Sequence, residues 1–135
     1  GVTAAVAAPA YAGIPVTHRG VAHEFTVISG HLPPSHPDSL VEWEAVAKLR
    51  GTLVLLMAVE NAPAIRDALL AGGRPATTPA AVVADGTMPA ERTVLTTLGD
   101  LGDDIAAHSI RPPAIIVIGD VVRVAHPDHY GSSIG

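Results

Sequence analysis

Three short runs of uninterrupted apolar residues constrain the fold of this 135-residue chain more than any other feature. They occupy residues 52–57, 80–84 and 114–118, and each is too short for a buried helix. Strands that lack a polar alternation are buried on both faces, as in a sheet that is covered by helices. The three runs therefore predict the core strands of an α/β domain.

The segments between these runs predict two further strands and several helices. Residues 25–29 are β-branched and aromatic, and residues 92–97 alternate as a half-buried strand does. The connection between residues 84 and 92 is too short for a helical crossover, so the strands that it joins should be antiparallel. Helices are expected over residues 3–10, 40–50, 62–71 and 98–107. The predicted fold is an α/β domain with a mixed sheet of about five strands and helices packed on both faces.

Specific expectations attach to two of these helices and to the end of the chain. Leu40 and Trp43 are expected on the buried face of the second helix, and Asn61 is expected to cap the third with its side chain. Residues 119–124 should close the fold. The polar, glycine-rich residues 125–135 are predicted to form a flexible tail.

The composition argues against several kinds of partner and site. A formal net charge of -5 does not suit general binding to nucleic acid or to an anionic membrane. No apolar run reaches the roughly 18 residues that span a bilayer. The lack of cysteine excludes disulfides and thiolate metal sites and fits a reducing, cytoplasmic location. No two histidines have the i, i+4 spacing of a helical metal site, and the tightest pair, His126 and His129, falls in the predicted tail, so no metal is expected.

Candidate ligand contacts lie at the strand ends and near the start of the chain. In open α/β sheets, ligands bind beyond the carboxyl ends of the strands, and residues 57–60 and 84–87 are two such ends. Thr17, His18 and Arg19 form a compact polar triplet after a Gly-Ile-Pro turn. The triplet suits ligand contact and local loop fixation equally well, and a methionine such as Met57 is more often a core residue. The residues alone predict an α/β domain with a pocket.

Two motifs near the start of the chain are more specific. Residues 1–5 read Gly-Val-Thr-Ala-Ala, and residues 10–19 read Ala-Tyr-Ala-Gly-Ile-Pro-Val-Thr-His-Arg. Further segments with the same likeness are residues 27–32, 42–44, 52–57, 82–87 and 113–119. Together they strongly resemble the uroporphyrinogen-III C-methyltransferases of the tetrapyrrole methylase family, over nearly the whole chain to about residue 124.

This resemblance implies an enzyme, a cofactor and a domain. Members of the family transfer methyl groups from S-adenosyl-L-methionine, which leaves S-adenosyl-L-homocysteine. They convert uroporphyrinogen III to precorrin-2 by methylation at C-2 and C-7, in siroheme and cobalamin biosynthesis. They are homodimers whose subunits hold the cofactor between two α/β domains. Residues 1–124 are then a C-terminal domain that is expected to be inactive without the N-terminal methylase domain, which carries the catalytic acid/base residues.

The resemblance also implies site residues. The implied cofactor contacts are Thr3, Ala4, Met57 and Gly86. Met57 and Gly86 are expected to end adjacent buried strands, where a glycine lets backbone amides approach the adenine. Ala58 stands where the family usually has glycine, and its methyl group is expected to narrow the pocket slightly.

The implied substrate carries eight carboxylates, which arginine recognises well. Arg19 is the expected contact, with Thr17 and His18 orienting it or the edge of the tetrapyrrole. Two alternatives remain open at this point. The chain could belong to another precorrin methyltransferase of the cobalamin pathway, or act in isolation as a catalytically silent folding, dimerisation or cofactor-binding module. Whether the parent protein is fused to a siroheme dehydrogenase/chelatase is also open.

Overall fold

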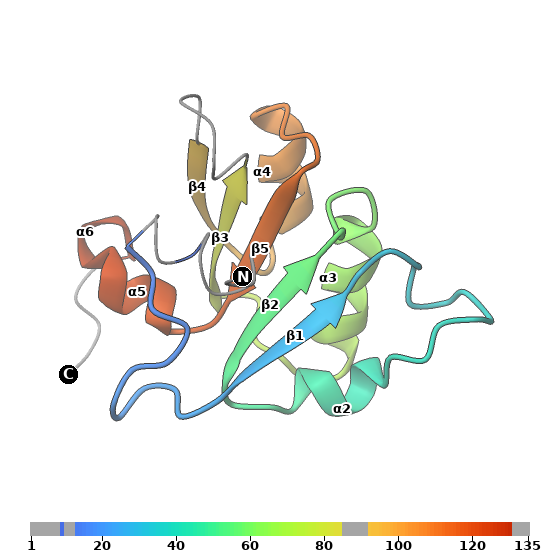
Figure 1. Cartoon of the computed structure of the whole chain (residues 1–135), viewed down its shortest axis with the longest axis horizontal. Helices are drawn as coiled ribbons and strands as arrows, with labels where there is room; N and C mark the ends of the chain where they lie inside the picture. Colours follow the sequence, from blue (N-terminus) through green and yellow to red (C-terminus); the bar gives the residue numbers. More distant parts are fainter. Residues whose placement is uncertain (1–8, 10–12, 85–91, 131–135) are drawn as a thin grey trace, which may run out of the picture.

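Five strands form one mixed sheet in the computed structural model, which describes residue 9, residues 13–84 and residues 92–130 (Figure 1). The strands are β1 (Phe25–Ser29), β2 (Thr52–Leu56), β3 (Pro79–Ala84), β4 (Arg92–Thr97) and β5 (Ala114–Ile118). Their spatial order is β1-β2-β5-β3-β4. β1 and β2 are parallel, whereas the β2–β5, β5–β3 and β3–β4 pairs are antiparallel. The predicted mixed sheet is confirmed.

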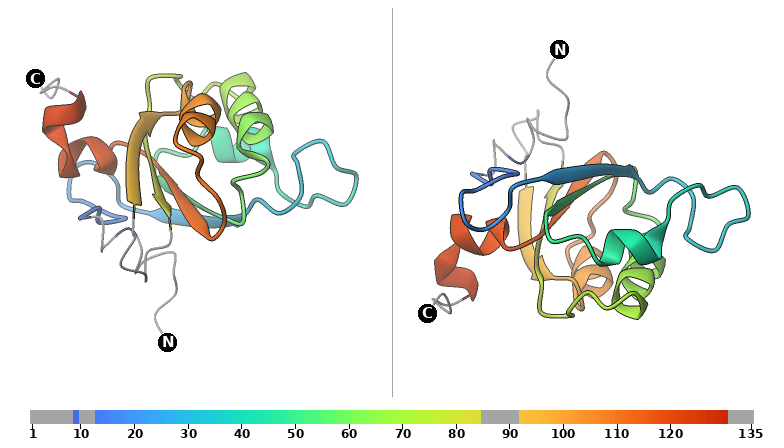
Figure 2. Two further views of the ribbon diagram at one scale, coloured as in Figure 1. Left: turned by 90° about the horizontal axis from the view of Figure 1, so that it is seen from above. Right: turned by 90° about the horizontal axis from the view of Figure 1, so that it is seen from below.

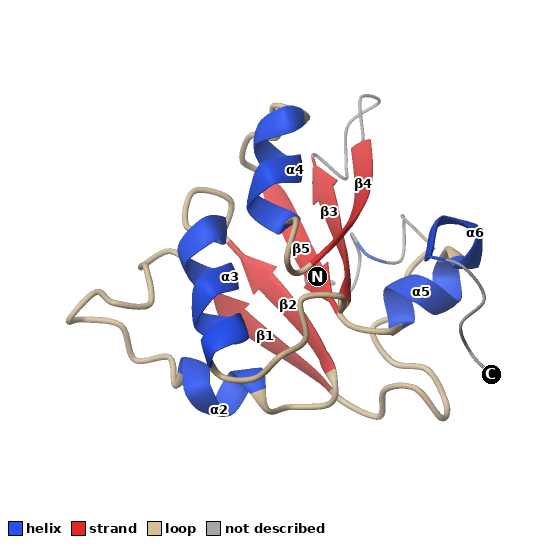
Figure 3. Cartoon of the chain, turned by 180° about the vertical axis from the view of Figure 1, so that it is seen from behind, coloured by secondary structure: helices blue, strands red, loops and turns tan. Residues whose placement is uncertain are grey.

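Helices cover both faces of this sheet. They are α2 (Trp43–Ala47), α3 (Ala62–Ala71), α4 (Leu101–Ala107), α5 (Val121–Ala125) and α6 (Pro127–Tyr130). α2, α3 and α4 lie on one face, which we call face A (Figure 3). Residues 14–22 and α5 pack on the opposite face, face B (Figure 2). None of the helices in the described part of the chain is long and apolar enough to cross a membrane.

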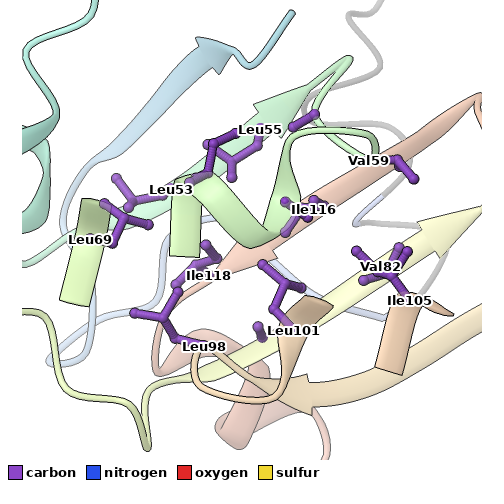
Figure 4. Packing of buried hydrophobic residues seen from close by; sticks show 14 of the residues in the cluster. Leu53, Leu55, Val59, Leu69, Val82, Leu98, Leu101, Ile105, Ile116 and Ile118 are labelled. Atoms are coloured by element: carbon purple, nitrogen blue, oxygen red, sulfur yellow. The ribbon is translucent and has the colours of Figure 1, made fainter. Parts of the chain in front are cut away.

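The core is aliphatic, and most of it lies on face A. Leu53 and Leu55 of β2 and Ile116 and Ile118 of β5 point toward α3 and α4 (Figure 4). β5 lies between β2 and β3, and other segments of the chain pack against both of its faces. All five of its residues are therefore buried. This position explains why its sequence is apolar without alternation.

Face B is only partly covered, and its bare part lies on β1. Val27 is in register with Val54, which belongs to the face B core cluster, so Val27 points toward the same face. Phe25 shares that face because side chains alternate along a strand. Phe25 and Val27 are 38% and 45% exposed. An apolar strip of β1 is therefore open to solvent in this chain.

Three expectations about the helices are wrong. The second helix is shorter than predicted and begins at Trp43, so Leu40 precedes it by a full turn and is 93% exposed. Asn61 precedes α3 but makes no side-chain capping hydrogen bond; its NH2 group instead donates to the carbonyl oxygens of Gly30 and His31. The fourth predicted helix also starts later, at Leu101, although Leu98 is fully buried as expected.

Part of the predicted tail forms a helix and contacts the sheet. Residues 127–130 form α6, and the Tyr130 hydroxyl lies 2.9 Å from the carbonyl oxygen of Ala80 and 2.7 Å from that of Thr96. A hydroxyl proton is donated to one carbonyl at a time, so the two alternate as acceptors. Residues 131–135, the predicted turn at residues 85–87 and most of the predicted helix over residues 3–10 lie outside the described residues.

Candidate functional site

The carboxyl ends of β1, β2 and β3 meet at one edge of the sheet. β1 is parallel to β2, and β2 and β3 are both antiparallel to β5, so all three run in the same direction. Met57 directly follows β2 at this edge, which is where ligands of open α/β sheets bind. The sequence predicted that β2 and β3 would be adjacent, and this prediction is wrong. β5 lies between them and separates them by about 10 Å.

Met57 has an unusual backbone conformation. Its φ is 54°, in the left-handed region that residues other than glycine rarely adopt, and the residue is 63% exposed. Such conformations persist where surrounding contacts hold them, and they concentrate at functional sites. The exposed thioether side chain offers an adaptable apolar surface to a ligand.

Ala58, the departure from the family pattern, is turned away from solvent. It is 0% exposed, and its Cβ lies 2.5 Å from the position that a Cβ on Gly30 would occupy. The Ala58 methyl group therefore fills a space that Gly30 leaves open between β1 and the end of β2. The methyl group is buried in the core, so it does not narrow a cofactor pocket at the surface.

The polar triplet Thr17–His18–Arg19 sits on a small closed loop. The backbone amides of His18 and Ala22 donate to each other's carbonyl oxygens, both at 2.9 Å. Nδ1 of His18 lies 3.1 Å from the carbonyl oxygen of Arg19, so the imidazole fixes this loop. Buried Val16 and Ala22 anchor it on face B, while all three triplet residues are exposed. Within the described residues, the Arg19 side chain has no ion-pair partner.

The structure does not bring this triplet next to Met57. The segment from residue 13 to residue 24 leads into the amino end of β1 (Figure 1). Met57 follows the carboxyl end of β2, which is parallel to β1. The length of a five-residue strand, about 15 Å, therefore separates the two groups along the sheet. The exposed strip of Phe25 and Val27 lies between them.

Comparisons with known proteins establish the family. A family model described as Tetrapyrrole (Corrin/Porphyrin) Methylases matches residues 1–102. The chain belongs to the tetrapyrrole methylases. It is 40% identical over 124 residues to an S-adenosyl-L-methionine-dependent uroporphyrinogen III methyltransferase of Methanosarcina barkeri, covering 92% of the chain and 49% of that protein. It is 45% identical over 122 residues to a siroheme synthase of Neisseria meningitidis serogroup C, covering 90% of the chain and 25% of that protein.

Solved structures of methyltransferases have a similar fold over most of this chain. The uroporphyrin-III C-methyltransferase of Thermus thermophilus, complexed with S-adenosyl homocysteine, has a TM-score of 0.75 and 35% identity. The match covers 92% of the chain and 50% of the Thermus protein. A cobalt precorrin-4 methyltransferase has a TM-score of 0.81 at 26% identity, over 90% of the chain and 51% of that protein. The chain thus spans about half the length of these methyltransferases and about a quarter of the siroheme synthase.

Of the cofactor contacts predicted for this chain, only Met57 lies among the described residues. Thr3, Ala4 and Gly86 lie outside the described residues. Sequence reasoning missed two residues that support Met57, namely Gly30 and Asn61, which hold the turn around it. Asn61 was singled out as a helix cap. Its side-chain contacts could not be read from the sequence, because the partners, Gly30 and His31, precede it by 31 and 30 positions in the chain.

A groove of about 810 Å3 runs along β4, away from these residues. Several of its polar groups are already engaged: Thr96 donates to the Asp104 carboxylate, and Arg92 donates to the carbonyl oxygen of His108. Burial raises the pKa of Tyr130 to about 12, so its phenol stays neutral at ordinary pH. In the described residues, no group of three or more His, Asp or Glu side chains could hold a metal ion. The groove is therefore a less suitable site than the edge at Met57.

Proposed function

We propose that this chain is the C-terminal half of an S-adenosyl-L-methionine-dependent C-methyltransferase that converts uroporphyrinogen III to precorrin-2. The observation that carries the proposal is its 40% identity, over 92% of its length, to a uroporphyrinogen III methyltransferase. The exposed, left-handed Met57 at the carboxyl edge of the sheet supports it. The reaction would methylate C-2 and C-7 in siroheme or cobalamin biosynthesis.

The described part of the site fits the cofactor. S-Adenosyl-L-methionine supplies an electrophilic sulfonium methyl group to a nucleophilic pyrrole carbon. Met57 would contact it through an exposed, polarisable side chain, and Thr3, Ala4 and Gly86 are the other contacts that we assign. Because methyl transfer needs in-line alignment and a dry site, the contribution of this chain is to orient the two reactants and to exclude water.

Arg19 is proposed to bind carboxylates of the tetrapyrrole, with Thr17 and His18 orienting it or the substrate edge. The exposed guanidinium has no ion-pair partner among the described residues, and the His18 imidazole fixes the loop that carries it. In the full-length enzyme, Arg19→Ala should raise KM for uroporphyrinogen III about tenfold, since one charge-assisted contact is lost. Arg66→Ala, on α3 at face A, is the matched control and should leave KM unchanged. Wild-type KM and turnover in Arg19→Ala would refute this role.

The proposal includes a partner domain. The chain covers about half of the related methyltransferases, and an apolar strip of face B is bare. We infer that an N-terminal methylase domain, carrying the catalytic acid/base residues, completes the cleft, and that the complete enzyme is a cytoplasmic homodimer. Calorimetry with S-adenosyl-L-homocysteine tests this: the chain alone should bind weakly or not at all, and the full-length enzyme should bind. Micromolar binding by the chain alone would instead favour a self-sufficient binding module.

One observation favours a second candidate. The TM-score to the cobalt precorrin-4 methyltransferase, 0.81, exceeds that to the Thermus enzyme, 0.75. The sequence favours uroporphyrinogen III, because identity to the Thermus enzyme is 35% against 26%. Product analysis separates the two: the full-length enzyme should form precorrin-2 from uroporphyrinogen III, and failure to methylate this substrate would favour a later precorrin.

A further inference from the structure

The side chain of Asn61 joins two segments at the carboxyl edge of the sheet. Its Nδ2 atom donates to the carbonyl oxygen of Gly30 at 2.8 Å and to that of His31 at 3.0 Å. Both partners are acceptors only, so the amide orientation is fixed: the NH2 group must face them. Both of its N–H groups are then used. The NH2 group is thereby committed to the segment that leaves β1, and the side chain makes no capping hydrogen bond to α3.

The same two segments enclose Met57 from both sides. On the residue before Met57, the carbonyl oxygen of Leu56 accepts a hydrogen bond of 2.7 Å from the Gly30 amide. On the residue after it, Ala58 is buried against Gly30. The backbone amide of Asn61 donates to the carbonyl oxygen of Ala58 at 3.1 Å, which closes the turn after Met57. Gly30 and Asn61 thus hold the residues on each side of Met57.

A left-handed methionine needs such support. The conformation is unfavourable for a residue with a Cβ, and it persists only where the surrounding contacts determine it. Met57 itself is exposed and contributes little packing, so its φ of 54° is maintained by its neighbours. Asn61 is the one side chain among these neighbours that bonds the β1 segment directly. Loss of its two hydrogen bonds would release the segment after β1 and relax the turn.

We propose that Asn61 is a positioning residue of the cofactor site: its side-chain amide clasps the Gly30–His31 segment and so presents Met57 in the left-handed conformation at the sheet edge. The inference rests on the proposed function, in which Met57 contacts S-adenosyl-L-methionine. Asn61 itself does not need to touch the ligand. Asn61→Asp is the sharpest variant, because it keeps the shape of the side chain and replaces the donor NH2 with an oxygen that repels both carbonyls.

The first experiment does not depend on any ligand. The chain has 2 methionines, Met57 and Met88, so carbon-13 methyl labelling of methionine gives two resonances that a Met88→Leu variant assigns. Asn61→Asp and Asn61→Ala should shift and broaden the Met57 resonance. Tyr130→Phe is the matched control, since it also removes a hydroxyl that bonds backbone carbonyls but does so at β3 and β4. It should leave the Met57 resonance unchanged.

The second experiment measures the dissociation constant of S-adenosyl-L-homocysteine in the full-length enzyme. We expect Asn61→Asp and Asn61→Ala to weaken binding about tenfold. This is the effect expected when the one or two hydrogen bonds that hold the site in its binding conformation are lost. Tyr130→Phe should bind S-adenosyl-L-homocysteine as tightly as the wild type does, even if its melting temperature falls as far as those of the Asn61 variants. A general loss of stability would weaken binding in all three variants.

The outcomes separate this inference from the proposed function. If the wild type binds S-adenosyl-L-homocysteine and the Asn61 variants bind equally well, the positioning role is overturned and the proposed function stands. If the wild type does not bind, the proposed function fails as stated. The methyl spectra then still decide whether Asn61 holds Met57, and an unmoved Met57 resonance in both Asn61 variants would overturn the inference outright.

Discussion

At the scale of single residues, the environment of Tyr130 changes the chemistry of its side chain. Its hydroxyl lies within hydrogen-bond distance of the carbonyl oxygens of Ala80 and Thr96, a directly paired position of β3 and β4. Desolvation disfavours the phenolate, and burial therefore raises the pKa of Tyr130 from 10.0 to about 12. The neutral phenol donates a proton that the phenolate lacks. The docking of α6 against the sheet therefore depends on protonation.

The stability of the wild-type chain should accordingly fall at alkaline pH. Between pH 10 and about 12 the folded state keeps the Tyr130 proton and the unfolded state loses it, so the free energy of unfolding decreases as pH rises. Because the side chain is only partly buried, we expect a loss of about 1 kcal/mol over this window. Urea denaturation at several pH values measures it. Tyr130→Phe removes this dependence, and an equally steep decline in that variant would assign the effect to other groups.

At the scale of secondary-structure elements, the contact between Gly30 and Ala58 fixes how the end of β1 meets the turn after β2. A Cβ on Gly30 would lie 2.5 Å from the Ala58 Cβ and 2.9 Å from its Cα. Gly30→Ala should therefore destabilise the chain by about 2 kcal/mol, as overpacking of a tight contact does. Ala58→Gly should restore part of this loss, because it removes the nearer atom and leaves the Cα. Urea denaturation of both single variants and the double variant gives the coupling energy, and strictly additive effects would contradict the contact.

The same scale shows why the sequence predicts some elements and not others. β2 and β5 were predictable because strands buried on both faces need unbroken apolar residues. α6 was not, because Tyr130 bonds carbonyl groups 50 and 34 residues away, and nothing local signals them. At the site, the end of a predicted strand pointed to residues 57–60, and only the resemblance to a family named Met57 as a cofactor contact. Its left-handed φ escaped prediction because this conformation usually belongs to glycine or asparagine.

At the scale of the whole molecule, the bare strip on face B distinguishes this chain from the complete enzyme that we propose. Val27 and Phe25 are 45% and 38% exposed, although they lie on the same face of the sheet as a buried cluster that includes Val54. Exposed apolar patches of this kind are typical of surfaces that another domain or protein covers. A charge on Val27 should therefore matter little in the isolated chain and greatly in the full-length enzyme.

Val27→Asp tests this difference. In the isolated chain it should cost about 1 kcal/mol or less, because the side chain is nearly half solvated and loses mainly its preference for strands. In the full-length enzyme the same carboxylate would be buried without a partner, so the melting temperature should fall by several degrees and turnover with it. Leu40→Asp is the control, since Leu40 is 93% exposed and lies outside face B, and it should change neither protein. Wild-type melting and turnover of full-length Val27→Asp would mean that the strip remains open to solvent, and the partner domain would then have to pack elsewhere.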